Sequence, residues 1–282
     1  MSRVAVVGAG TMGNGIAHVF AQHGWDTALV DVSRPALERA LDTIRRNLER
    51  QVKKGALKPE ERDAALGRIR TETGLDPAAN ADLVVEAATE HQDVKFKIFR
   101  DLDRAAPPSA ILASNTSSIS ITAIAGQTRR PAQVIGMHFM NPAPVMQLVE
   151  VVRGLETSDE TTHRVLAIAT ALGKTPVVVH DAPGFVSNRV LMPMINEAIF
   201  CVMEGVASAE AVDQVMKIGM NHPLGPLALA DLIGLDVCLA ILQVLHRDLG
   251  DDKYRPAPLL AQLVAAGHLG KKSGRGFHVY RD

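Results

Sequence analysis

The stretch that decides the fold is Arg3-Val4-Ala5-Val6-Val7-Gly8-Ala9-Gly10-Thr11-Met12-Gly13, which continues into a helix-like run over Gly15–Ala21. A second apolar run, Thr27–Val30, ends on Asp31, 21 residues after Gly10. A glycine motif of this kind is informative when it follows a strand, opens a helix and precedes a second strand that ends in an acid. All of these parts are present, so the segment predicts the first β-α-β unit of a doubly wound α/β sheet.

Each glycine of the motif has a physical role in binding a dinucleotide. Gly8 allows the tight turn after the strand, Gly10 leaves room for a pyrophosphate, and Gly13 lets the helix pack closely on the strand. The free N–H groups of the helix start, at Thr11 and Met12, face the phosphates. The alternative is a glycine-rich turn in an α/β protein that binds no nucleotide.

Asp31 indicates which dinucleotide is bound. A carboxylate at the end of the second strand accepts hydrogen bonds from the ribose hydroxyls and repels a 2′-phosphate. The sequence therefore predicts NAD as cofactor rather than NADP, although the nearby Arg34 weakens that preference.

The composition excludes several other classes of protein. The chain has 282 residues, of which 47% are hydrophobic and 22% charged, with a net charge of −1, so we expect one large or two moderate globular domains and no electrostatic attraction to nucleic acid or membrane. No uncharged apolar run approaches the length of a membrane span, and the start of the chain does not resemble a signal peptide. Cys201 and Cys238 lie in apolar helix-like sequence, outside any metal-binding pattern, which indicates reduced thiols and a cytoplasmic protein without a metal site.

A basic helical hairpin is expected after Asp31. Apolar residues spaced by three and four predict a helix from Ser33 to Gly55, and a shorter helix begins near Pro59. The first helix is rich in arginine and ends at Lys53 and Lys54. These charges form either a solvated helix face or a landing site for a polyanionic ligand.

The rest of the chain divides into a strand-rich part and a helical part. Strand patterns continue until Asp181-Ala182-Pro183-Gly184, and the sequence after that break is helical. We therefore expect a Rossmann-like sheet domain with a helical hairpin insertion at 1–182, followed by an all-α C-terminal domain at 183–282. An apolar helical set of this size is expected to bury one face against a second subunit.

Polar residues follow two of the expected strands. Glu90 comes after the strand at 81–88, and the loop Asn115–Ser118 follows the strand Ile111–Ala113. Ligands of an open α/β sheet bind at the carboxyl ends of its strands, as does the glycine turn. These segments are therefore candidates for the same site.

A dehydrogenase that oxidises an alcohol needs a base for the hydroxyl proton, and histidine titrates in the right range. His138 ends a predicted strand, and Glu150, near the next strand, can pair with it and set its tautomer. His180 also ends a strand and is the main alternative. A buried histidine that pairs with a structural carboxylate is the non-catalytic alternative.

Several segments resemble one enzyme family. His138-Phe139-Met140-Asn141-Pro142-Ala143-Pro144-Val145-Met146-x-Leu148-Val149-Glu150 resembles the catalytic segment of the L-3-hydroxyacyl-CoA dehydrogenases, as does Ser114–Ser118 before it. Asp181-x-Pro183-Gly184-Phe185-Val186-x-Asn188-Arg189 is similar to the signature of that family at its domain junction, and Pro223–Pro226 and Gly274–Phe277 also match. The resemblance covers the whole chain and is strongest to the bacterial branch that acts on 3-hydroxybutyryl-CoA.

The resemblance implies a set of catalytic and substrate contacts. His138 is the base in oxidation and the acid in reduction, Glu150 orients it, and Ser117 and Asn188 hydrogen-bond the 3-oxygen of an acyl-CoA substrate. Lys53 and Lys54 meet the CoA phosphates, and the protein is a homodimer through its C-terminal domain. The expected contacts to NAD, from the glycine motif and from the resemblance together, are Gly8, Gly10, Thr11, Met12, Gly13, Asp31, Glu90, Lys95, Asn115, Ser117 and Asn141.

Two other classes of function stay open. One is a related dehydrogenase of a free 3-hydroxy acid or a sugar acid, since gulonate-type relatives share the fold and the His–Glu pair. The other is a non-catalytic NAD-binding protein. Acyl chain length, physiological direction and pathway, whether butanoate or fatty acid metabolism, are also open.

Overall fold

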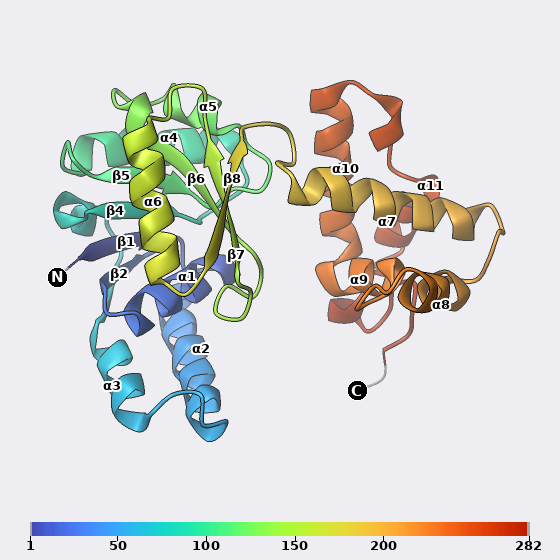
Figure 1. The fold of residues 1–282 in the computed structure, drawn as a ribbon, viewed down its shortest axis with the longest axis horizontal. Coiled ribbons are helices and arrows are strands. Elements are labelled where there is room, and N and C mark those ends of the chain that lie inside the picture. Colours follow the sequence, from blue (N-terminus) through green and yellow to red (C-terminus); the bar gives the residue numbers. More distant parts are fainter. Residues whose placement is uncertain (1, 281–282) are drawn as a thin grey trace. The chain divides into compact units, whose positions relative to one another are not determined.

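The computed structural model describes residues 2–280 and divides the chain into two compact units, Met1–Asp181 and Ala182–Asp282 (Figure 1). The first unit is a mixed α/β sheet with helices on both faces, and the second is built of helices. This confirms the predicted fold class of a Rossmann-like domain followed by a helical domain.

The first unit is organised around one sheet whose strand order is β3-β2-β1-β4-β5-β6-β7-β8. Neighbouring strands run parallel except for β6 and β7, which pair in antiparallel register, so β7 and β8 run against the rest. The strands are β1 Arg3–Val7, β2 Asp26–Val30, β3 Ile69–Glu72, β4 Leu83–Glu86, β5 Ile111–Ser114, β6 Val134–Phe139, β7 Leu148–Arg153 and β8 Thr175–His180. Every residue of β4, β5 and β6 is buried, as expected for strands that helices cover on both faces.

Helices cover both faces of this sheet (Figure 1). Those of the first unit are α1 Thr11–Gln22, α2 Arg34–Lys53, α3 Pro59–Gly67, η1 Asp76–Asn80, α4 Gln92–Ala105, α5 Ile121–Ala125, η2 Pro131–Gln133 and α6 Asp159–Ala171. Apolar residues of α1, α2 and α6 share one buried cluster with the strands. Gly136 of β6 faces α5, since a Cβ there would lie 3.1 Å from Cδ1 of Ile121. The carboxyl ends of β1, β4, β5 and β6 remain at one edge of the sheet.

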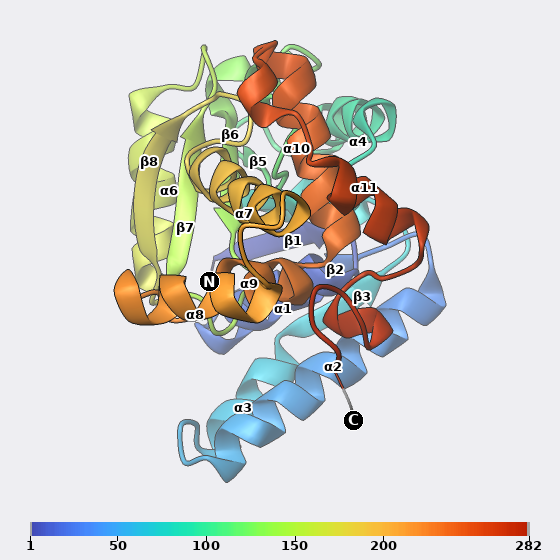
Figure 2. The same ribbon diagram turned by 90° about the vertical axis from the view of Figure 1, so that its right-hand side faces the viewer.

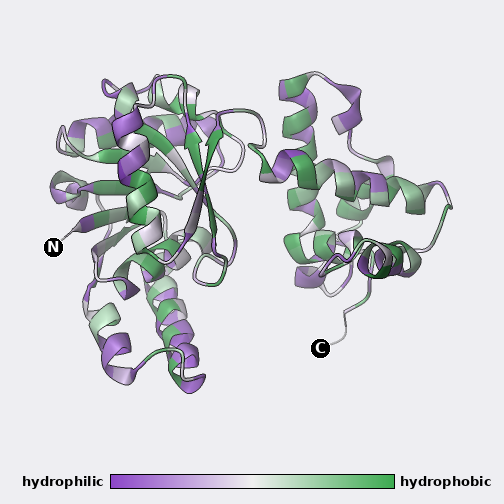
Figure 3. Cartoon of the chain, viewed as in Figure 1, coloured by the Kyte–Doolittle hydropathy of each residue, from purple (hydrophilic) through white to green (hydrophobic). Residues whose placement is uncertain are grey.

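The predicted hairpin is present as α2 and α3, inserted between β2 and β3. Ser33 caps α2 by accepting the Ala36 N–H at 3.3 Å. The buried residues of α2 are Leu37, Ala40, Ile44 and Leu48, spaced by three and four. Figure 3 shows hydrophilic and hydrophobic residues alternating along α2, and Lys53 and Lys54 are exposed at its far end.

The second unit contains α7 Ser187–Met203, α8 Ala209–Gly219, α9 Pro226–Ile233, α10 Leu235–Leu249, η3 Asp252–Tyr254, α11 Pro258–Ala265 and η4 Lys271–Ser273 (Figure 2). α9 and α10 are separated at Gly234, which has φ +107°, and the two helices are bent by 98° there. Within residues 2–280 no single helix has the length and apolarity of a membrane span, and only this bent pair meets that test when taken together.

Two buried aspartates organise the second unit and explain two glycine motifs. Asp213 accepts the Leu227 and Ala228 N–H groups at 2.8 and 2.9 Å, and a Cβ on Gly225 would lie 2.3 Å from its side chain. Asp231 accepts the Phe277 and His278 N–H groups, both at 2.9 Å, and a Cβ on Gly276 would lie 1.9 Å from its Oδ1. These glycines are therefore required by the close approach of the backbone to buried carboxylates.

His18 is a buried polar residue of α1. It is fully buried, its Nε2 lies 3.0 Å from Oε1 of Gln22, and within the described chain its Nδ1 has no hydrogen-bond partner. Burial lowers the pKa of this imidazole from 6.5 to about 4, and the nearby His23 and Lys174 lower the pKa further, against the Gln22 hydrogen bond.

This shift predicts acid sensitivity of the folded state. The unfolded chain binds a proton at His18 with a pKa near 6.5, whereas the folded chain does so only near 4, so the free energy of unfolding falls as the pH drops through that window. Between pH 7 and pH 4 the free energy of unfolding of the parent should fall by up to about 3 kcal/mol more than that of a His18→Gln variant. Urea unfolding at each pH measures this difference. Parallel curves for the two proteins would contradict the assignment.

Candidate active site

The glycine turn between β1 and α1 is built by close backbone contacts. Gly8 has φ +106°, and a Cβ there would lie 2.5 Å from Cα of Ala88. A Cβ on Gly13 would lie only 1.7 Å from the carbonyl oxygen of Gly8. Around Gly10, by contrast, no described heavy atom lies within 4 Å of the equivalent position. The turn is therefore tight at its two ends and open in the middle, which suits the approach of a pyrophosphate.

Asp31 joins this turn to the end of β2. Its Oδ2 accepts the Ala9 N–H at 2.8 Å, and its Oδ1 accepts the Ser33 N–H at 2.9 Å. The carboxylate is half-buried, so it is held at the edge of the turn, where a ribose would lie in a dinucleotide site. Thr11 is exposed and Met12 half-buried in the first turn of α1.

A hollow beside the turn is lined by both α1 and α2. Gly10, Thr11 and Asn14 form one side of it, and Arg39 and Thr43 lie on the other. The hollow places a guanidinium side chain next to the open glycine, which favours an anionic ligand there.

His138 and Glu150 form a buried pair because of the sheet register. The antiparallel pairing of β6 with β7 sets these residues directly opposite each other, where side chains meet across a sheet. Nδ1 of His138 lies 2.8 Å from Oε2 of Glu150, and the two residues are 8% and 2% exposed. The carboxylate therefore accepts the Nδ1 proton, and Nε2 becomes the nitrogen that exchanges a proton.

The loop after β5 is held by Glu90. The carboxylate accepts hydrogen bonds from Thr116 Oγ1 at 2.6 Å, from the Ser117 N–H at 3.0 Å and from Ser118 Oγ at 3.2 Å. Asn115 turns the other way, and its Oδ1 accepts the Phe139 N–H at 2.9 Å, next to His138. The structure thus brings together Glu90, the serine loop and the end of β6, as the positions of these residues at strand ends indicated.

Lys95 is placed differently from the expected contact with a cofactor ribose. Its side chain is only 1% exposed, and its Nζ forms an ion pair with the buried carboxylate of Glu86 and lies 3.4 Å from Oγ of Ser114. Glu86 ends β4 with no exposed surface, so its charge requires a buried cation. In the structure Lys95 supports the ends of β4 and β5 through Glu86 and Ser114, and its contact with a cofactor ribose stays a prediction.

Lys174 is a further residue that the sequence reasoning missed. Its Nζ donates to the carbonyl oxygens of Ala143 and Met146 at 2.6 and 2.8 Å, and burial lowers its pKa. These carbonyls belong to the loop between β6 and β7, which also carries the exposed Asn141. Lys174 therefore fixes the loop that links His138 to Glu150.

The other expected residues lie elsewhere. Asn188 is in the first turn of α7 and is 9% exposed, and it belongs to the second unit. His180, the alternative to His138, is exposed at the end of β8. Within residues 2–280 no group of three or more His, Cys, Asp or Glu side chains is arranged to hold a metal ion.

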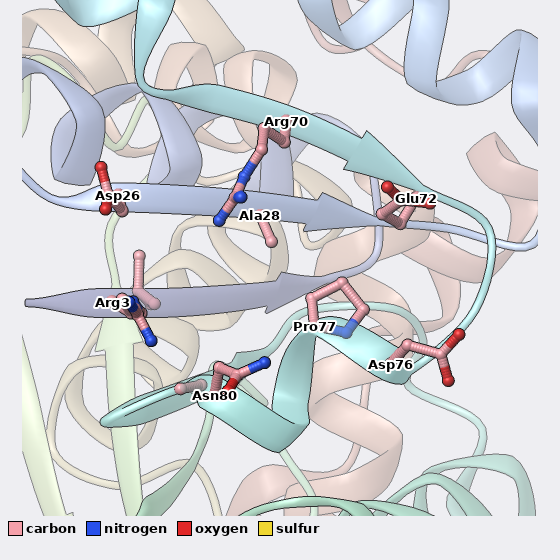
Figure 4. A pocket seen from close by; sticks show the side chains of 10 residues that line it. Arg3, Asp26, Ala28, Arg70, Glu72, Asp76, Pro77 and Asn80 are labelled. Carbon is pink, nitrogen blue, oxygen red and sulfur yellow. The ribbon is translucent and has the colours of Figure 1, made fainter.

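A different hollow lies over β1, β2 and β3, beside η1 (Figure 4). Its lining includes Arg3 and Arg70 together with Asp26, Glu72 and Asp76, so charges of both signs face it. None of the expected site residues lines this hollow, and it is not the candidate site.

The sheet edge therefore combines an open glycine turn for a dinucleotide with a buried imidazole–carboxylate pair, which defines a nicotinamide-dependent dehydrogenase. The family described as 3-hydroxyacyl-CoA dehydrogenase matches the chain in both parts, its NAD-binding domain over residues 3–182 and its C-terminal domain over residues 184–280. The chain belongs to this 3-hydroxyacyl-CoA dehydrogenase family, which confirms the resemblance and the NAD cofactor.

Individual relatives match over their full length. A Bacillus subtilis protein named "Probable 3-hydroxybutyryl-CoA dehydrogenase" is 56% identical over 100% of this chain and 98% of its own. The "3-hydroxybutyryl-CoA dehydrogenase" of Bradyrhizobium diazoefficiens is 52% identical over 100% and 96%. Among solved structures, the (S)-3-hydroxybutyryl-CoA dehydrogenase of Ralstonia eutropha superposes with a TM-score of 0.96 at 50% identity and covers both chains completely.

Alanine substitutions at Gly10 and Gly13 are expected to have different effects, the first on NADH affinity and the second on thermal stability. Gly10→Ala should weaken NADH binding about tenfold or more without changing the melting temperature, because the added methyl group occupies only the open space. Gly13→Ala should lower the melting temperature by roughly 5 °C or more through its clash with Gly8. NADH fluorescence titration and thermal unfolding measure the two effects.

Gly67→Ala is the matched control, because no described atom lies within 4 Å of its Cβ position and it is remote from the turn in sequence. It should preserve both properties. Unaltered NADH binding by Gly10→Ala would contradict the placement of the pyrophosphate.

Proposed function

We propose that the protein catalyses the NAD-dependent oxidation of (S)-3-hydroxyacyl-CoA to 3-ketoacyl-CoA, and the reverse reaction, with 3-hydroxybutyryl-CoA as a short-chain substrate. The observation that carries the proposal is the buried His138–Glu150 pair, connected through Phe139 and Asn115 to the serine loop at the carboxyl edge of the sheet. The full-length identity to proteins named 3-hydroxybutyryl-CoA dehydrogenase supports the choice of substrate.

In this proposal His138 moves the proton. Its Nε2 accepts the proton of the 3-hydroxyl group as the C3–H bond breaks, and hydride acceptance is the chemistry that bound NAD supplies. Glu150, 2.8 Å from Nδ1, stabilises the imidazolium that forms, because an ionised acceptor strengthens this hydrogen bond as the ring becomes charged. In the reverse direction the same imidazolium returns the proton to the 3-oxygen.

Other residues are proposed to position the reactants. Ser117 and Asn188 hydrogen-bond the 3-oxygen, and Asn115 and Asn141 lie near the nicotinamide. Glu90 contacts the cofactor ribose while it holds the serine loop. Lys95 acts through the Glu86 ion pair, which supports the end of β4.

The nucleotide end of the substrate is assigned to the hairpin. Lys53 and Lys54 are exposed at the end of α2, roughly 20 Å along the helix from Arg39 beside the glycine turn. A linear CoA can span that distance, and its phosphates would meet a helix face that is already rich in arginine. The test compares kcat/KM for the CoA thioester with kcat/KM for a short pantetheine thioester. A smaller ratio of the two in a Lys53→Ala, Lys54→Ala variant than in the parent would support this assignment.

The second unit is proposed to form a homodimer interface. Val206, Val215, Ile218 and Met220 of this unit are each at least 61% exposed, and apolar side chains at that exposure favour association with a second copy. A monomer mass in sedimentation equilibrium would contradict this part of the proposal. We also propose a cytoplasmic location, since both cysteines are free thiols.

The reaction is tested by oxidation of NADH, followed at 340 nm, with acetoacetyl-CoA. We expect turnover with acetoacetyl-CoA and NADH, and little with free acetoacetate or with NADPH, because Asp31 repels a 2′-phosphate. A chain-length series of 3-ketoacyl-CoA thioesters would then define the acyl preference. Turnover of free acids without CoA dependence would replace the proposal with a free-acid dehydrogenase.

The acid–base role is tested at His138. His138→Gln should lower kcat by at least about a hundredfold and leave the NADH dissociation constant close to that of the parent. The ring is lost as a proton carrier, whereas the glycine turn, which is proposed to hold the pyrophosphate, is not altered. His180→Gln is the matched control and should retain the parent kcat. If KM rises in His138→Gln while kcat is unchanged, the assignment is wrong.

A further inference from the structure

Asp181 is the last residue of the first unit, and its carboxylate binds the segment that follows the serine loop. Oδ2 accepts the hydroxyl of Ser120 at 2.6 Å and the Thr122 N–H at 2.8 Å, and Oδ1 accepts the Ile121 N–H at 3.1 Å. One side chain thus makes three hydrogen bonds to three consecutive residues that are about 60 positions earlier in the sequence.

These bonds satisfy the start of α5. The first N–H groups of a helix have no partner inside it, and Asp181 accepts two of them. Ser120 adds a third bond at this end by accepting the Ala123 N–H at 3.1 Å. The five-residue helix α5 is too short to be stable by itself, so its position depends on these contacts.

The residues that follow β7 also contact the start of α5. Thr122 Oγ1 accepts the Leu155 N–H at 3.0 Å, and a Cβ on Gly154 would lie 3.2 Å from the Thr122 nitrogen. The Asp181 N–H in turn donates to the carbonyl of Arg153 at 2.9 Å. The start of α5 therefore lies against the ends of β7 and β8.

Ser117 lies between two carboxylate anchors. Glu90 binds the loop at Thr116, Ser117 and Ser118, and Asp181 binds the segment that follows the loop, Ser120–Thr122. Beyond Asp181, the chain enters a turn in which the Phe185 N–H donates to Ala182 at 2.9 Å, and Asn188 follows at the start of α7.

We propose that Asp181 is a positioning residue for the active site. Its carboxylate fixes the segment that directly follows the serine loop, at the point where the chain leaves the first unit. The segment that it holds begins three residues after Ser117, which is proposed to bind the 3-oxygen. The identity of the substrate in this inference rests on the proposed function. The hydrogen bonds of Asp181 to Ser120, Ile121 and Thr122 do not depend on it.

The test compares Asp181→Asn and Ser120→Ala with Ser158→Ala. An asparagine side chain keeps one acceptor oxygen but turns an NH₂ group toward a backbone donor, so it cannot restore all three bonds. Ser158 is a matched control because it caps α6 in the same way, accepting the Thr161 N–H at 3.1 Å, and it has no contact with the serine loop among the described residues.

We expect kcat/KM for acetoacetyl-CoA to fall about tenfold or more in Asp181→Asn, while the NADH dissociation constant stays at the parent value. Ser158→Ala should lower only thermal stability. The effects of Asp181→Asn and Ser120→Ala on kcat/KM should be less than multiplicative, because both remove the same contact, whereas Asp181→Asn and Ser158→Ala should multiply. Equal kinetic losses in Asp181→Asn and Ser158→Ala would reduce Asp181 to a stability role and overturn the inference.

Hydrogen exchange gives a readout that does not depend on turnover. The amides of Ile121 and Thr122 should exchange faster in Asp181→Asn than in the parent and should be unchanged in Ser158→Ala. Unchanged exchange at these amides would overturn the positioning role whether or not the parent is active. The parent protein could fail to reduce acetoacetyl-CoA while its Ile121 and Thr122 amides still exchange more slowly than those of Asp181→Asn. That result would overturn the proposed function and leave the positioning role of the Asp181 hydrogen bonds in place.

Discussion

The antiparallel pairing of β6 with β7 is the constraint on which the catalytic edge depends. In a wholly parallel sheet a crossover connection would separate these strands, and Glu150, 12 residues after His138, could not lie opposite it. The reversal sets Glu150 opposite His138 and leaves a connecting loop at the ligand edge. Because side chains alternate along a strand, a slip of one residue would turn His138 and Glu150 to opposite faces. The register therefore determines the chemistry.

Carboxylates that differ in burial organise several segments of the first unit. Glu86 accepts donors from Lys95 and Ser114, Glu90 holds the serine loop, Asp31 holds the glycine turn and Asp181 holds the start of α5. Each of these carboxylates accepts at least two hydrogen bonds. Loops that would otherwise be mobile are thus pinned by single side chains from distant positions in the chain. Precise placement of a base and of hydrogen-bond donors needs this kind of support.

The sequence was sufficient where local physics decides the structure. The glycine turn, the strand patterns, the α2–α3 hairpin and the break at Gly234 follow from spacing and from the special conformations of glycine. Placement of Glu90 and Asn115 at strand ends was enough to expect them near one another. The role of His138, by contrast, rested mainly on the family resemblance, since two strands end in histidine.

What the sequence could not show depends on burial and on long-range contacts. The sequence did not reveal the ion pair of Lys95 with Glu86, 9 residues earlier, because the pair depends on the full burial of Glu86. Lys174 and Asp181 have no local pattern that reveals their acceptors and donors, which lie tens of residues away. The buried ammonium of Lys174, bonded to carbonyl oxygens rather than to a carboxylate, costs desolvation free energy that an apolar residue would avoid. Lys174 is best explained by the position that it imposes on the loop between His138 and Glu150. Defined geometry at the catalytic edge is thus obtained at the expense of stability.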